Sequence, residues 1–150
     1  MRAKNFILMK SFHSSDLDSL AESFGQAGGI FVPELEGPAA AFFAGALFHE
    51  FPGAWLCITD GPRTQETFHR DLQSLFPKRA GRILNYPAWE SYPNLAPEIT
   101  GERLRAQQVL AESPGPCIVV SCIQALMQPT LSPAALEKAV IALRTGDQAD

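Results

Sequence analysis

The spacing of apolar residues along this chain alternates between a helical and an extended pattern. The pattern begins with a helix that Ser15 can cap and that Gly28 and Gly29 end, followed by a short apolar segment over Ile30–Leu35. Four residues of this helix share one face, at the i, i+3, i+4, i+7 spacing: Leu17, Leu20, Ala21 and Phe24. The first part of the chain therefore predicts a helix followed by an extended segment.

The next blocks predict two helices, each followed by a strand. A helix is expected from Pro38 to Phe51 and a strand over Ala54–Thr59. Asp60 can cap a further helix, and a short strand is expected over Arg82–Tyr86. The predicted buried face of the first helix is Phe43, Ala44, Leu47, Phe48 and Phe51, and that of the second is Phe68, Leu72, Leu75 and Phe76.

The remaining pattern completes an alternation of helices and strands. The proline-rich stretch 87–97 has no usable period and predicts an ordered loop, after which helix signals resume at Glu98. The nearly unbroken apolar run Pro116–Cys122 is typical of a parallel strand covered on both faces. One more helix is expected from Ser132. The fold class predicted is α/β, with a parallel sheet flanked by helices.

Composition limits the classes of function. The chain has 150 residues, of which 46% are hydrophobic, and a formal net charge of -4, which argues against strong autonomous binding to a phosphate backbone. No apolar run approaches the roughly 18 residues that cross a bilayer, and residues 1–10 lack the features of a signal peptide. We therefore expect a cytoplasmic protein. Cys57, Cys117 and Cys122 have no paired spacing and are interpreted as small core residues.

A phosphate-binding loop in such a fold would lie in the turn after the first extended segment, Ile30–Leu35. If Gly37 is aligned with the last glycine of G-x-x-x-x-G-K-[ST], Val32 replaces the first glycine, Pro38 the lysine and Ala39 the hydroxyl residue. Proline has neither an N–H nor an ammonium group, and alanine offers no oxygen to magnesium. Glu36 adds a negative charge. The loop is therefore predicted to be degenerate and to bind no nucleotide.

Other candidate groups favour structural explanations. The histidines, His13, His49 and His69, are too scattered for a zinc site and are expected at the surface or at caps. Glu98 and Glu102 lie one helical turn apart, but the helix dipole explains two carboxylates near a helix start more simply than acid–base catalysis. We therefore predict no catalytic residue, no metal and no cofactor.

Two segments in order resemble one known family. Tyr86–Pro93, followed by Pro97–Ile99 and Glu102–Leu104, resembles the P-x-W-E-t-l-P-y … i-x-x-R-l stretch near the start of transcription-repair coupling factors, the Mfd family. Ile118–Gln128 resembles that family's strand followed by A-L-M-Q. Gly37–Ala40 is similar to its helix start. The motif residues, which we interpret as structural, are Trp89, Glu90, Pro93, Arg103 and Gln128.

The resemblance implies a non-catalytic module at the amino-terminal end of a DNA-repair translocase. It implies a degenerate P-loop, RecA-like helicase-type domain over residues 1–128, similar to the excinuclease protein UvrB, and the truncated opening of a docking domain over residues 129–150. In the family that docking domain binds the excinuclease protein UvrA, whereas RNA polymerase, DNA and ATP-driven translocation involve other regions. Two alternatives stay open: a nucleotide-dependent helicase-like or UvrB-like enzyme with a divergent phosphate loop, and an unrelated small α/β domain.

Three structural points follow from the pattern and the resemblance. Trp89 and Tyr92 should be largely buried in the loop, because large rings left in water forgo favourable burial. UvrB has a long damage-probing hairpin in the region that matches Tyr92 to Glu98, and only a short loop stands here. We expect residues 1–150 to form an incomplete folding unit, in which an apolar patch beside the strand Pro116–Cys122 lacks its cover.

Overall fold

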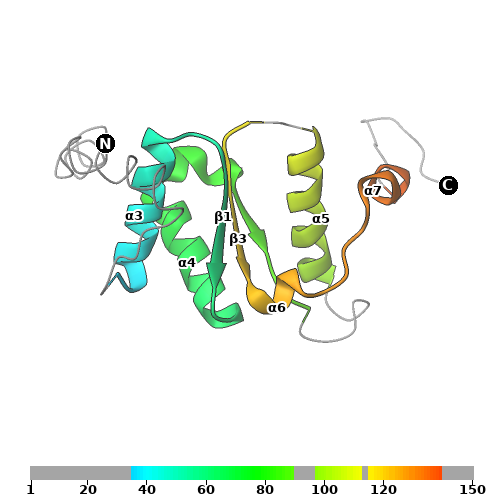
Figure 1. Ribbon diagram of the computed structural model, residues 1–150, viewed down its shortest axis with the longest axis horizontal. Helices are drawn as coiled ribbons and strands as arrows, with labels where there is room; N and C mark the ends of the chain where they lie inside the picture. Colours follow the sequence, from blue (N-terminus) through cyan, green and yellow to red (C-terminus); the bar gives the residue numbers. More distant parts are fainter. Residues whose placement is uncertain (1–34, 90–96, 113–114, 140–150) are drawn as a thin grey trace, which may run out of the picture.

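The computed structural model describes residues 35–89, 97–112 and 115–139, which form a three-stranded parallel sheet with helices on both faces (Figure 1). This confirms the predicted α/β class with a parallel sheet flanked by helices. The helix expected from Ser15 and residues 30–34 of the apolar segment after it lie outside the described residues. No helix in the described ranges is long and apolar enough to cross a membrane.

The first half of the described chain follows the sequence pattern closely. Helix α3 spans Gly37–Glu50, strand β1 spans Ala54–Thr59 and helix α4 spans Pro62–Leu75. A 3-10 segment, η1, covers Pro77–Arg82 and leads directly into strand β2, Ile83–Tyr86. The residue that caps α4 is Gly61 in an extended conformation, so the prediction of Asp60 as the cap was wrong by one position.

The second half adds one long helix, the central strand and two short helices. Helix α5 spans Pro97–Glu112 and strand β3 spans Cys117–Cys122. Helix α6, Ile123–Leu126, follows β3 without a break, and helix α7 spans Pro133–Ala139. Every residue of β3 is buried, as the unbroken apolar run predicted.

The strand order is β1-β3-β2, so the last of these three strands in the sequence lies in the centre. The β1–β3 register runs from Ala54 opposite Cys117 to Thr59 opposite Cys122, and on the other side Ile83 lies opposite Ile118. All three strands are parallel, and their carboxyl ends therefore meet at one end of the sheet, next to α6 in Figure 1.

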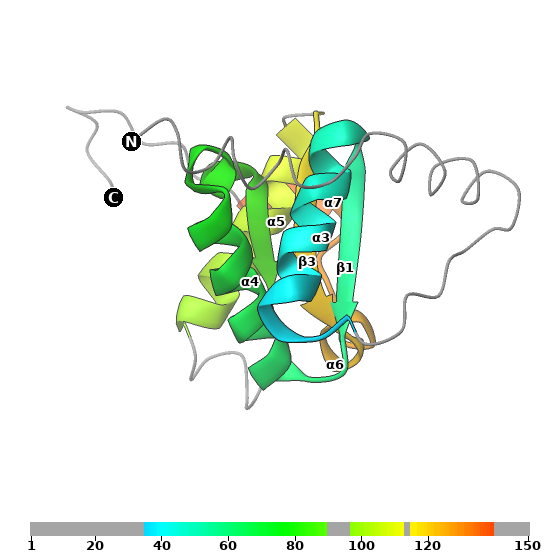
Figure 2. The same ribbon diagram turned by 90° about the vertical axis from the view of Figure 1, so that its left-hand side faces the viewer.

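Helices α3 and α4 cover one face of the sheet, and α5 lies on the opposite face (Figure 1). In Figure 2, α3 lies in front of β1 and β3, with α4 beside it. The core beneath them contains Ala41, Phe48, Leu72, Ile83, Ile118 and Val120. The smaller core beneath α5 contains Leu84, Ala106 and Val119. Both cores involve β2 and β3, which positions the polar groups at the ends of these strands.

The face of α3 that is buried differs from the prediction. Leu47 and Phe48 are buried as expected, but Phe43, Ala44 and Phe51 are only partly buried. The remaining buried residues are Ala41, Gly45 and Ala46. The helix is apolar on most of its circumference, and periodicity alone therefore could not select the face that contacts the sheet.

The cysteines agree with their interpretation as core residues. Cys117 and Cys122 are buried, Cys57 is partly buried, and all three are free thiols. Burial raises the pKa of the Cys57 thiol to about 11, so this side chain is neutral at physiological pH.

Candidate functional site

The carboxyl end of β2 and β3 is organised by a buried arginine. Arg103 is in the middle of α5, and only 3% of its surface is exposed. Its Nη1 donates to the Pro87 carbonyl at 2.7 Å, and its Nη2 donates to the Tyr86 hydroxyl at 2.9 Å and to the Pro129 carbonyl at 3.1 Å. A longer bond of 3.5 Å reaches the Ala125 carbonyl in α6. One guanidinium group therefore joins α5 to the segments that follow β2 and β3.

Two aromatic rings complete the surroundings of this guanidinium. The Cζ atom of Arg103 lies 4.1 Å from the ring centroid of Tyr86 and 5.0 Å from that of Trp89, which are cation–π distances. Burial lowers the pKa of Arg103, and Tyr86 and Cys122 oppose that shift. An arginine side chain is not deprotonated in proteins at neutral pH, so the rings and carbonyls stabilise a permanent cation.

A second polar contact fixes the loop that leaves β2. The side-chain amide of Gln128 accepts a hydrogen bond from the Trp89 N–H at 2.7 Å and donates one to the Trp89 carbonyl at 3.0 Å. This paired geometry satisfies both backbone groups of one residue with one side chain, as a neighbouring strand would. Trp89 itself has only an intermediate exposure, in agreement with the expected burial, and Tyr92 lies outside the described residues.

The structure brings together three of the five motif residues, Trp89, Arg103 and Gln128. The other two, Glu90 and Pro93, lie outside the described residues. The chemistry of the cluster is that of a structural joint, because the donors of Arg103 are directed at carbonyls and a phenol of its own chain. We call Trp89, Arg103 and Gln128, together with Tyr86 and Pro129, the Arg103 joint.

The segment predicted to be a degenerate phosphate loop leads into the start of α3. Gly37 has a φ of 54°, a left-handed conformation that favours glycine, and the first turn of the helix contains Pro38. Pro38 and Ala39 are both exposed, and no side chain caps this helix end. Val32 lies outside the described residues. The helix end therefore offers neither an ammonium group nor a hydroxyl group from the two positions where a phosphate loop would have them.

The other candidate groups are dispersed. His49 is exposed and lies 3.2 Å from Glu50, while the His69 ring forms a 3.2 Å hydrogen bond with the Ile83 carbonyl. The Glu102 carboxylate accepts a hydrogen bond from Asn85 in β2, and Glu98 is exposed in the first turn of α5. Among the described residues, no group of three or more His, Cys, Asp or Glu side chains could hold a metal ion.

The sequence patterns did not predict a polar relay that crosses the edge strand β2. Gln65 of α4 donates to the Asn85 side-chain oxygen at 2.7 Å, and Asn85 donates to the Glu102 carboxylate of α5 at 2.7 Å. Gln65 is 1% exposed, and its nitrogen also reaches the Val120 carbonyl at 3.3 Å. Its Oε1 is buried and has no hydrogen-bond donor in the described structure, a situation that costs about 1–3 kcal/mol. We call Gln65, Asn85 and Glu102 the edge relay.

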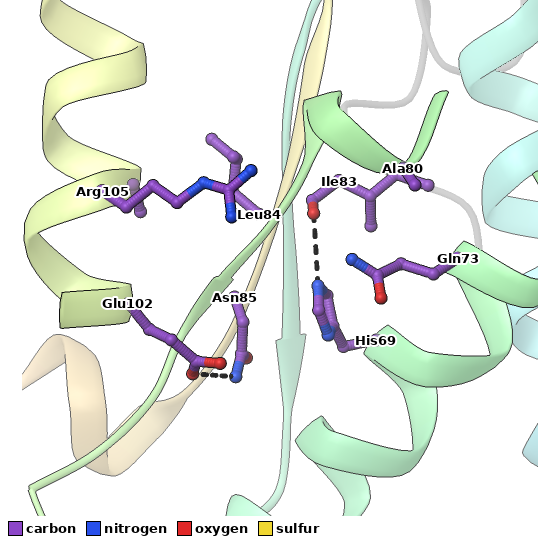
Figure 3. A pocket seen from close by; sticks show the side chains of 9 residues that line it. His69, Gln73, Ala80, Ile83, Leu84, Asn85, Glu102 and Arg105 are labelled. Atoms are coloured by element: carbon purple, nitrogen blue, oxygen red, sulfur yellow. Dashed lines mark hydrogen bonds between the residues drawn. The ribbon is translucent and has the colours of Figure 1, made fainter. Parts of the chain in front are cut away.

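Two hollows flank the edge relay and share Asn85 and Glu102. The larger, of about 250 Å³, lies at the carboxyl end of β2. The smaller, of about 190 Å³, lies further along the strand; in Figure 3 the Asn85–Glu102 contact is on one of its walls and His69, bonded to the Ile83 carbonyl, is on the opposite wall. Both hollows have polar and charged side chains in their walls, and they lie on the β2 edge of the sheet.

One sequence signal could have identified the relay. Gln65 occupies the same helical stripe as Phe68, Leu72 and Phe76, at spacings of three, seven and eleven residues. A polar residue on an apolar stripe requires a buried partner. The partner, Asn85, is 20 residues further along the chain and could not be identified from spacing.

No protein-family model matches this chain, and no curated protein or solved structure matches it either.

Proposed function

We propose that the chain is a non-catalytic module of a transcription-repair coupling factor of the Mfd family, acting in the cytoplasm. In this proposal, residues 1–128 belong to a RecA-like helicase-type domain with a degenerate phosphate loop, and residues 129–150 begin a docking domain. The module helps to recruit the excinuclease protein UvrA to a stalled RNA polymerase. The polymerase and DNA are bound by other regions of the protein.

The observation that carries the proposal is the Arg103 joint. Trp89 comes from the W-E-x-x-P-like segment, Arg103 from the helix after it, and Gln128 from the A-L-M-Q-like segment. These positions are separated by up to 39 residues in the sequence, yet Trp89 contacts both Arg103 and Gln128 at the end of the sheet. Both family-like segments contribute residues to one joint, and this shared structural role gives a reason for their occurrence together in one protein. The joint also bonds to Pro129, at the start of the proposed docking domain.

The start of α3 supports a module without nucleotide chemistry. Pro38 and Ala39 replace the lysine and the hydroxyl residue that a phosphate loop uses for the phosphates and magnesium. We therefore expect calorimetry with magnesium and ATP to give no binding heat. A dissociation constant in the micromolar range or below would contradict the proposal and favour the alternative of a helicase-like enzyme.

The recruitment role is tested with the full-length protein that contains this chain. The purified protein should form a complex with UvrA in size-exclusion chromatography with light scattering, and the same protein without residues 1–150 should not. RNA polymerase binding should survive that deletion, because the proposal places it elsewhere. UvrA binding that is absent from the full-length protein, or unchanged by the deletion, would disprove the recruitment role.

A further inference from the structure

The larger hollow beside the edge relay has the character of a binding site for an organic cation. We propose that it binds a guanidinium group on a short apolar stem, from a small arginine-type molecule or from an arginine side chain of a partner. The hollow has a volume of about 250 Å³. It is lined by Pro62, Gln65, Glu66, Asn85, Pro87, Ala88, Ile99 and Glu102.

The polar part of this lining consists largely of hydrogen-bond acceptors. Glu66 and Glu102 come from helices on opposite faces of the sheet, so their carboxylates can approach one ligand from two sides. The described lining contains no lysine, arginine or histidine to neutralise them. A guanidinium group offers five N–H donors in a planar fork and no acceptor, which complements such a lining.

Gln65 supplies an independent indication that a donor is missing. The Val120 carbonyl can only accept a hydrogen bond, so the amide nitrogen of Gln65 must be the atom that faces it at 3.3 Å. This orientation leaves Oε1 buried and without a donor among the described residues. Gln65 is 1% exposed and forms part of the wall of the hollow. A ligand N–H that enters deeply would satisfy this oxygen.

The rest of the lining suits the carbon stem of such a ligand. Pro62, Pro87, Ala88 and Ile99 are apolar, and they can cover methylene groups while the charged head reaches the carboxylates. The position also agrees with general experience of α/β folds, in which ligands bind beyond the carboxyl ends of parallel strands. Pro62 begins the helix after β1, and Pro87 directly follows β2.

The lining of the smaller hollow explains why we assign the cation to the larger hollow. The smaller hollow is lined by Arg105 and His69 in addition to Asn85 and Glu102. Figure 3 shows the Arg105 side chain extending from α5 over this hollow. A permanent positive charge there disfavours a second cation. The described lining of the larger hollow contains the Glu66 and Glu102 carboxylates and no positively charged side chain.

The test is an NMR titration of the ¹⁵N-labelled protein with methylguanidinium chloride, and methylurea as the neutral control. The side-chain amide signals of Gln65 and Asn85 should shift and saturate with methylguanidinium and stay in place with methylurea. Glu102→Gln keeps an acceptor for Asn85 but removes the charge. It should weaken binding about fivefold to tenfold, the effect of losing one charge-assisted hydrogen bond.

Glu98→Gln is the matched control, because it removes a carboxylate from the same helix outside the hollow. It should leave the affinity unchanged, and an equal loss in both variants would show general ionic attraction and overturn the proposal. Argininamide and acetyl-Gly-Arg-Gly-amide then distinguish the two sources of guanidinium. Tighter binding of the first supports a small-molecule ligand, tighter binding of the second supports a partner peptide, and binding of neither overturns the proposal.

Discussion

The guanidinium of Arg103 holds together α5, the end of β2, helix α6 and the segment at Pro129. A charged group with 3% exposure is tolerated only because carbonyls, a phenol and two rings replace its water. The rigidity of this end of the sheet therefore depends on one side chain that belongs to none of the apolar cores.

Replacing Arg103 by alanine should lower the free energy of unfolding by about 3 kcal/mol or more, because several charge-assisted hydrogen bonds are lost and their buried acceptors remain. Urea denaturation followed by circular dichroism measures this change. Arg105→Ala, an exposed position on the same helix, is the control and should stay within about 0.5 kcal/mol of the original protein. Equal effects of the two variants would contradict the structural role of the Arg103 joint.

Cys57 gives the chain a defined response to alkaline pH. Its pKa is about 11 in the folded protein, compared with an ordinary value of 9.0, because burial disfavours the thiolate. The folded state therefore retains a proton that the unfolded state loses. This contribution to stability is complete below about pH 9 and is lost as the pH rises to about 11, for a total of about 2 to 3 kcal/mol.

Urea titrations of the original protein and of Cys57→Ala at pH 8 and pH 10.5 isolate this contribution from the other groups that titrate in the same range. The difference in stability between the two proteins should change between the two pH values, with the original protein losing more. Parallel pH profiles would show that the thiolate is not disfavoured by the fold.

At the scale of the elements, α3 and α4 are packed closely enough that a glycine is required at one contact. A Cβ atom at Gly45 would overlap the ring of Phe76, which follows α4. Gly45→Ala should therefore destabilise the protein by about 1 to 3 kcal/mol, although alanine is the better helix former. Thermal melting followed by circular dichroism measures the loss.

Gly101 provides the comparison, because it lies inside α5 and a Cβ atom there would meet nothing within 4 Å. Gly101→Ala should raise stability by about 0.5 to 1 kcal/mol through helix propensity alone. Two substitutions of the same kind should thus have opposite signs. Stabilisation by both would mean that α3 and α4 are not in close contact.

For the molecule as a whole, the part of the sheet that the described helices leave exposed has consequences in solution. Leu56 is 52% exposed and Ile58 is 55% exposed, on the half of the α5 face that belongs to β1. They lie in register with Val119 and Ser121 of β3. An exposed apolar patch beside the strand over Pro116–Cys122 was expected, and these residues form one.

We expect the chain to self-associate and to bind apolar dyes through this patch, because exposed β-branched and leucine side chains on an edge strand favour association. The double substitution Leu56→Thr and Ile58→Thr should shift sedimentation velocity profiles toward the monomer. Met127→Gln, at an exposed apolar residue outside the sheet, should leave association unchanged. A monomeric original protein with a melting temperature above about 65 °C would contradict the expectation.

Local patterns were sufficient for most elements of the fold. The predicted bounds of β1 match the structure, and the apolar run before Ile123 predicted a strand buried on both faces. These features depend on the spacing of side chains along a few residues, which is written in the sequence itself. Trp89, Arg103 and Gln128 were also identified from the sequence, but through resemblance to a family and without their contacts.

The sequence by itself therefore determined most of the helices and strands, because local spacing and turn chemistry act over short distances. Only the tertiary structure decided the order β1-β3-β2, the burial of Arg103 and the contacts of Gln65 with Asn85 and of Asn85 with Glu102. The physical reason is that an arginine or glutamine on a helix is normally solvated. Its burial depends on acceptors that distant parts of the chain supply after the sheet has formed.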